Sequence, residues 1–134
     1  MKTATAIAQT VVRAPGLILI VLGVLFWTGH ALTLIAVHML LGILLVLSLW
    51  TLAVIGARAG AKPGLFVLAI LWGFVVPALG MAQGRLLPGG AHWVIQVLHL
   101  LVGLSSMALA ERLARGMQGS AVPARPTQRA AGAD

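Results

Sequence analysis

Cysteine is absent from this chain of 134 residues, and acidic residues are almost absent. Without a thiol the chain has no disulfide, no thiolate metal site and no point of covalent attachment for a c-type haem. Its acidic residues are Glu111, at the end of the last apolar stretch, and Asp134, at the C-terminus. We therefore expect no carboxylate deep within an apolar segment, which disfavours ion coupling through a carboxylate relay.

Charge of either sign is scarce, because only 8% of the residues are charged while 60% are hydrophobic. The mean hydropathy is +1.07. A soluble domain has about 25% charged and about 45–50% apolar residues. This excess of apolar side chains is too large for a core surrounded by water, so the sequence predicts an integral membrane protein rather than a soluble enzyme.

The net charge of +7 is the feature that could suggest a nucleic-acid partner. However, the basic residues stand at the ends of apolar stretches and do not form a patch with interleaved aromatic residues. That placement is typical of membrane anchoring and topology signals. We therefore expect the lipid bilayer, and no nucleic acid, as the partner of this chain.

Four apolar stretches predict an all-α bundle of four transmembrane helices, since about 20 apolar residues span a bilayer. Pro15 is expected to start the first helix, and Pro77 to kink the third. The first apolar run is short enough for the hydrophobic region of a signal peptide, an alternative that the repeat described below disfavours. The expected helices are 15–28, 32–57, 65–82 and 91–113. They form a transmembrane domain, 15–113, which follows a cytoplasmic segment, 1–14, and precedes a disordered cytoplasmic tail, 114–134.

The positions of the basic residues predict the orientation of the bundle. Of the nine lysines and arginines, only Arg85 is expected on one side of the membrane, and the other eight are expected on the opposite side. Because lysine and arginine are enriched in cytoplasmic loops, we expect both termini and the middle loop in the cytoplasm, with the protein in the cell inner membrane. The residues expected on the cytoplasmic side are Lys2, Arg13, Arg58, Lys62, Arg112, Arg115, Arg125 and Arg129.

The two halves of the chain resemble each other. Pro-Gly-Leu at 15–17 recurs at 63–65, each time after a basic residue and before an apolar run. His-x-x-x-Gly at 38–42 recurs at 99–103. Two helices per unit give both units the same orientation, so the pattern predicts parallel repeats about an axis normal to the membrane. The second and fourth helices would then be parallel, with His38 and His99 at similar depth.

Histidines within the apolar stretches are the candidate functional residues, because a polar side chain inside a bilayer is costly. His38 and His99 lie roughly two helical turns within their spans, and imidazole is a common axial ligand of haem iron. Gly42 and Gly103, one turn further along, would leave room for a flat macrocycle. Arg85 could pair with haem propionates. Gln96, one turn before His99, could orient that imidazole through its second nitrogen.

These residues resemble the pattern of the small b-type membrane cytochromes, in which a four-helix bundle grips haem between histidines that are often followed by glycine. The resemblance covers residues 15–113 in architecture and the two His-x-x-x-Gly elements in motif. It implies haem b, electron transfer, and a quinone or redox protein as partner, with His38 and His99 as ligands. The spacing departs from that of two-haem members, so His30 and His92 are left to line the outer mouth or to bind a propionate, a metal or a quinone.

Other functions are compatible with the same residues. Glycine- and alanine-rich helix faces suit a non-catalytic accessory or scaffold subunit of a larger membrane complex, and a homo- or hetero-oligomer is expected. A transporter that moves a metal or small solute could also use the histidines. A purely structural interpretation of His38 and His99 is an interhelical hydrogen bond, which contributes about 0.6 kcal/mol. The sequence does not assign an enzymatic reaction.

Overall fold

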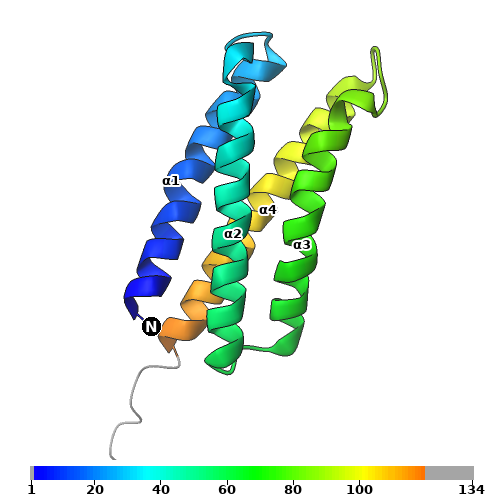
Figure 1. Ribbon diagram of the computed structural model, residues 1–134. Coiled ribbons are helices and arrows are strands. Elements are labelled where there is room, and N and C mark those ends of the chain that lie inside the picture. The colour runs from blue at the N-terminus through cyan, green and yellow to red at the C-terminus, as the bar shows by residue number, and fades with distance from the viewer. Residues whose placement is uncertain (1, 120–134) are drawn as a thin grey trace, which may run out of the picture.

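The computed structural model describes residues 2–119 and consists almost entirely of helix (Figure 1). Successive helices run in opposite directions and are joined by short connections. The start of α1, the α2–α3 connection and the end of α4 meet at one end, the terminal end, and the α1–α2 and α3–α4 turns form the other, the hairpin end. The elements are α1 (Lys2–Trp27), η1 (Leu32–Leu34), α2 (Ile35–Arg58), α3 (Pro63–Ala82), η2 (Gln83–Arg85) and α4 (His92–Gly119).

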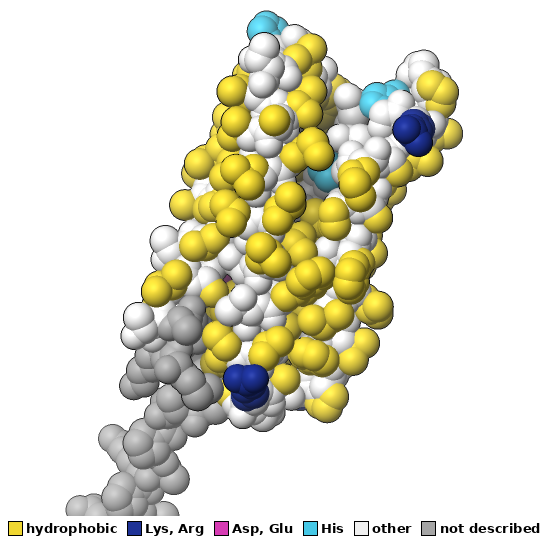
Figure 2. Space-filling model, viewed as in Figure 1, with side chains coloured by type: hydrophobic (Ala, Val, Ile, Leu, Met, Phe, Trp, Pro, Cys, Tyr) yellow, Lys and Arg dark blue, Asp and Glu magenta, His cyan; other side chains and the backbone are white. Residues whose placement is uncertain are grey.

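All four helices are long and apolar enough to cross a membrane, which confirms the prediction of a bundle with four candidate transmembrane helices. Their outward faces carry large apolar side chains, as Figure 2 shows for one side of the molecule. Leu71 and Phe74, for example, are 58% and 59% exposed. Such a surface suits lipid rather than water. The candidate spans are Ala6–Trp27, Leu32–Arg58, Pro63–Arg85 and His92–Met117.

The first helix begins earlier than the sequence predicted. We expected it to start at Pro15, but α1 begins at Lys2 and Pro15 lies inside it. Proline in a helix interior removes one backbone hydrogen bond. Burial of Ala8 and Val12 against the core favours the helical conformation on the N-terminal side of that proline. Pro77 also lies within a helix, α3, which is continuous from Pro63 to Ala82, and the expected kink there stays a prediction.

The last helix continues beyond its predicted end at residue 113. Leu113 and Ala114 are buried in the core, and α4 extends to Gly119. Residues 114–119 are therefore helical and do not belong to a disordered tail. The remainder of the expected tail, 120–134, lies outside the described residues.

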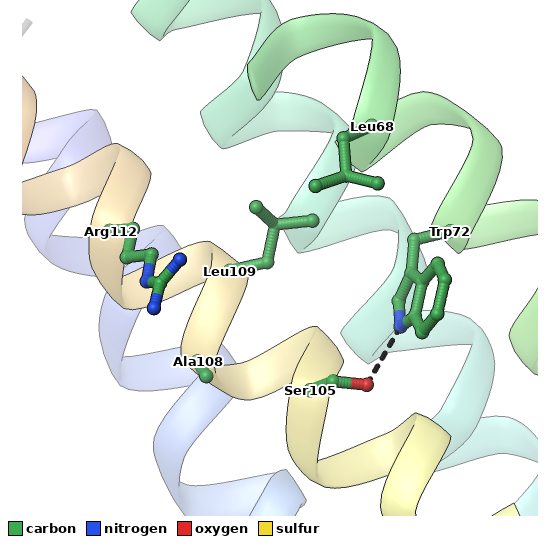
Figure 3. A pocket seen from close by; sticks show the side chains of 6 residues that line it. All are labelled: Leu68, Trp72, Ser105, Ala108, Leu109 and Arg112. Atoms are coloured by element: carbon green, nitrogen blue, oxygen red, sulfur yellow. Dashed lines mark hydrogen bonds between the residues drawn. The ribbon is translucent and has the colours of Figure 1, made fainter. Parts of the chain in front are cut away.

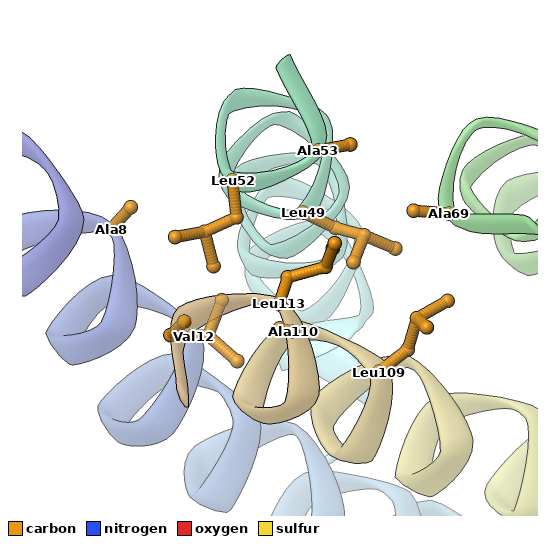
Figure 4. Close-up of a cluster of buried hydrophobic side chains, with 10 residues drawn as sticks. Ala8, Val12, Leu49, Leu52, Ala53, Ala69, Leu109, Ala110 and Leu113 are labelled. Atoms are coloured by element: carbon orange, nitrogen blue, oxygen red, sulfur yellow. The ribbon is translucent and has the colours of Figure 1, made fainter. Parts of the chain in front are cut away.

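The buried core lies in the half of the bundle next to the terminal end (Figure 4). Alanines from all four helices alternate there with larger apolar side chains. Small residues let helices approach closely, and in lipid this packing drives helix association. The core contains Ala8 and Val12 of α1, Leu49, Leu52 and Ala53 of α2, Ala69 of α3, and Leu109, Ala110, Leu113 and Ala114 of α4.

The helices α2 and α4 form the centre of the bundle. They contact each other, and each also contacts both α1 and α3, whereas α1 and α3 are not in contact over the described residues. Two tryptophans join neighbouring helices: Trp50 Nε1 donates to the Ile70 carbonyl oxygen at 3.3 Å, and Trp72 Nε1 donates to the Val102 carbonyl oxygen at 3.2 Å. The Trp50 indole lies against Gly73 of α3.

An ion pair joins α1 to α4 near the terminal end. Arg13 donates from Nη2 to Glu111 Oε2 at 2.9 Å and also from Nε to Glu111 Oε1. Such a two-point contact fixes geometry as well as neutralising charge. The ion pair explains how a carboxylate and a guanidinium are tolerated beside apolar helices, because the pair as a whole is neutral.

Replacing Gly73 with alanine should destabilise the bundle. An added Cβ would overlap the Trp50 indole, and that ring is held by its hydrogen bond to α3. Overpacking of this kind costs about 1–3 kcal/mol. The matched control is Gly16→Ala, whose Cβ would meet the flexible end of Met107. We expect a lower apparent melting temperature in detergent for Gly73→Ala than for Gly16→Ala, and equal losses would contradict this packing.

Candidate functional site

The bundle opens towards its hairpin end. In α2 the buried residues begin at Leu45, and in α3 only Ala69 and Gly73 are buried among the described residues. The two hairpins diverge in that half of the molecule (Figure 1). Figure 2 shows a hollow between them in which a histidine side chain is visible. The buried core cluster does not reach this end, where Leu22 of α1 and Ile95 of α4 are the residues that remain buried.

His38 of α2 and His99 of α4 come together, as the repeated His-x-x-x-Gly element predicted. Their ring centroids are 6.3 Å apart, and the planes are tilted by 44°. Both side chains are half-buried. Each ring has a buried Nδ1 atom without a hydrogen-bond partner. Because a buried polar atom without a partner is costly, the two imidazoles form the least satisfied polar group in this part of the bundle.

Apolar contacts hold the two rings. Phe26, at the end of α1, packs edge-to-face against His38 with ring centroids 5.3 Å apart. Gly80 of α3 lies beside His99, since a Cβ added to this glycine would stand 3.2 Å from His99 Cε1. Sequence reasoning missed both residues. The Gly-x-x-x-Gly pattern at 80–84 did signal a close contact, whereas nothing distinguishes Phe26 from other apolar residues of its helix.

Gly42 and Gly103 lie next to free space. Apart from the glycine itself, its chain neighbours and the backbone of its own helix, no atom comes within 4 Å of the position that a Cβ would take at either glycine. Each is one helical turn beyond its histidine, on the same face. The structure is therefore compatible with the expectation that these glycines leave room beside the two imidazoles.

Two other expected neighbours are not in contact with the histidine pair. Gln96 makes no hydrogen bond to His99, whose Nδ1 has no partner, so the expected orienting role of Gln96 is wrong for this structure. Arg85 is an exposed residue of η2 at the hairpin end and has no ion-pair partner among the described residues.

His30 and His92 belong to different hairpins: His30 lies in the α1–α2 connection, and His92 is the first residue of α4. The His30 ring is 3.1 Å from Thr28 Oγ1, and the His92 ring is 3.2 Å from the Leu86 carbonyl oxygen, both distances from Nδ1. Each histidine thus has a local partner. Within residues 2–119 no group of three or more metal-ligating side chains is assembled.

No protein-family model, no curated protein and no solved structure matches this chain. The chemistry of the site is therefore argued from its own residues. These are two imidazoles, one from α2 and one from α4, with apolar neighbours and no hydrogen bond from either buried Nδ1.

Cysteine substitution can test the pairing of His38 with His99, because the chain has no cysteine of its own. In the variant His38→Cys/His99→Cys we expect a short bifunctional thiol reagent to link the two positions within one chain. Intact mass spectrometry would show the mass of one linker and no free thiol. The control His30→Cys/His92→Cys should give two separate adducts. Two separate adducts in both variants would contradict the observed pairing.

Proposed function

We propose that this chain is a membrane electron-transfer protein that holds one b-type haem between His38 and His99. The observation that carries the proposal is the meeting of these two imidazoles, from the two central helices, with a ring-centroid separation of 6.3 Å. The length of that separation, the absence of a hydrogen-bond partner at either Nδ1 and the space beside the rings each support it.

The separation suits a single metal ion between the rings. If both imidazoles bound one metal ion, with metal–nitrogen bonds of about 2 Å, their ring centres would lie no more than about 6 Å apart. The observed 6.3 Å agrees with this value. Direct hydrogen bonding between the two histidines, the structural alternative, is not observed, and both Nδ1 atoms lack a partner.

Haem is favoured over a bare metal ion by the number of ligands. A haem supplies most of the nitrogen ligands of its iron, so His38 and His99 would be enough to complete the set. A protein-bound zinc ion needs three or four protein ligands, and the described residues assemble no group of three. The open space beside Gly42 and Gly103 is where a flat macrocycle could extend.

The residues of the chain have distinct roles in this proposal. A haem at this position supplies one-electron exchange. His38 and His99 would bind its iron and tune its potential. Phe26 would shield the His38 ring from water, and Arg85 at the hairpin end would pair with propionates. A membrane quinone or a redox protein is the proposed electron partner.

We also propose the orientation and symmetry that the sequence predicted. The terminal end, where the described basic residues other than Arg85 gather along the helix ends, would face the cytoplasm of a cell with this protein in its inner membrane. The arrangement of α2 and α4 as a central pair, flanked by α1 and α3, is what two parallel repeats about an axis between α2 and α4 would produce. An oligomer through the exposed helix faces fits the same arrangement.

The visible spectrum of the purified protein tests the proposed function. We expect protein expressed with sufficient haem to show a sharp Soret band and, after reduction with dithionite, separate α and β bands typical of two histidine ligands. His38→Ala and His99→Ala should each lose most of the bound haem, because one axial ligand is removed. His30→Ala should retain it, since the His30 ring has a local partner in its turn.

A second variant distinguishes loss of an iron ligand from misfolding of the chain. In His38→Gly, added imidazole should enter the vacated position and restore the low-spin spectrum. A colourless wild-type protein, even after addition of haem, would overturn the proposal and favour an accessory subunit, to be pursued through copurifying partners. Full low-spin haem in both His38→Ala and His99→Ala would overturn the ligand assignment.

A further inference from the structure

A groove between α3 and α4 lies outside the histidine site. It has a volume of about 260 Å³ and lies in the half of α4 beyond Val102. Figure 3 shows Trp72 at one end of the groove, Arg112 at the other, and Leu68 and Leu109 between them. Because Leu68 is 44% exposed, the groove opens on the outer surface of the bundle. The lining residues are Leu68, Trp72, Ser105, Ala108, Leu109 and Arg112.

Only one polar group of the groove is available to a ligand. Trp72 Nε1 donates to Ser105 Oγ at 3.0 Å, and that hydroxyl donates to the Leu101 carbonyl oxygen at 2.8 Å. Arg112, by contrast, has no ion-pair or hydrogen-bond partner among residues 2–119. A guanidinium without a partner matches a phosphate, to which it can donate two parallel hydrogen bonds.

The position of Arg112 along the span fits the depth of a lipid headgroup. Arg112 lies five residues before Met117, where the candidate span of α4 ends. That offset is about 7–8 Å of helix, within reach of an arginine side chain that extends to the interface. The apolar part of the groove then continues from Arg112 towards the middle of the span, the direction that an acyl chain takes. Basic pockets between transmembrane helices are known binding places for anionic lipid headgroups.

We propose that this groove binds one anionic phospholipid, with its phosphate on Arg112 and one acyl chain along Leu68, Ala108 and Leu109. The same geometry does not favour a quinone. A quinone has a carbonyl at each end of its ring, and the groove offers a free donor at Arg112 alone. The inference is independent of the haem proposal, because the groove shares no residue with the histidine site.

Native mass spectrometry of the full chain, released from detergent, tests the proposal. The protein is mixed with equal amounts of phosphatidylglycerol and phosphatidylcholine that have the same acyl chains. We expect one retained phosphatidylglycerol per chain and little phosphatidylcholine. Arg112→Gln should lower the retained phosphatidylglycerol about fivefold, the contribution of one basic residue near an anionic lipid. The control Arg58→Gln, at the exposed end of α2 and outside the groove, should not.

A second variant tests whether lipid binding depends on the shape of the groove and not only on positive charge. Ala108→Phe fills the groove, leaves the net charge unchanged, and should also release the lipid. Inorganic phosphate at millimolar concentration should not displace the lipid, because the acyl chain contributes to binding. The proposal is overturned if the two lipids are retained equally, if Arg112→Gln and Arg58→Gln have the same effect, if Ala108→Phe retains the lipid, or if phosphate displaces it.

Discussion

Close packing of small side chains at the terminal end is the constraint on which the rest of the bundle depends. Ala53 of α2, Ala69 of α3 and Ala110 of α4 are completely or almost completely buried there, and each brings two helix backbones together where a larger residue would separate them. The close contact of α2 with α4 makes them the central pair. Tryptophan hydrogen bonds then attach α3 to both central helices, and the Arg13–Glu111 pair attaches α1 to α4.

The same packing determines where a cofactor could be held. The buried core cluster lies in the half next to the terminal end, and the hairpins diverge in the other half. The His38 and His99 rings come together in that second half, with centroids 6.3 Å apart. Here both Nδ1 atoms lack a partner, and the glycines one turn beyond are next to free space. A site of this kind carries a cost in stability that a bound metal centre could offset.

Much of this fold is predictable from the sequence, and the reasons are physical. Four apolar stretches of spanning length predict four helices, and the repeated His-x-x-x-Gly element predicts that His38 and His99 meet. The start of α1 was predicted wrongly, because the preference of Pro15 for a first turn is outweighed by burial of Val12. The contact of Phe26 with His38 depends on how α1 rotates against α2, which hydropathy does not encode. The missing hydrogen bond between Gln96 and His99 depends on side-chain conformations that residue spacing alone does not determine.

The central claim of this account is that one iron centre is held by two histidines from α2 and α4. Low-temperature electron paramagnetic resonance of the oxidised protein, with haem quantified against chain concentration, tests it most directly. The account predicts a single low-spin ferric signal and one haem per chain. Absence of haem, a high-spin signal from iron with one protein ligand, or two haems per chain would contradict it.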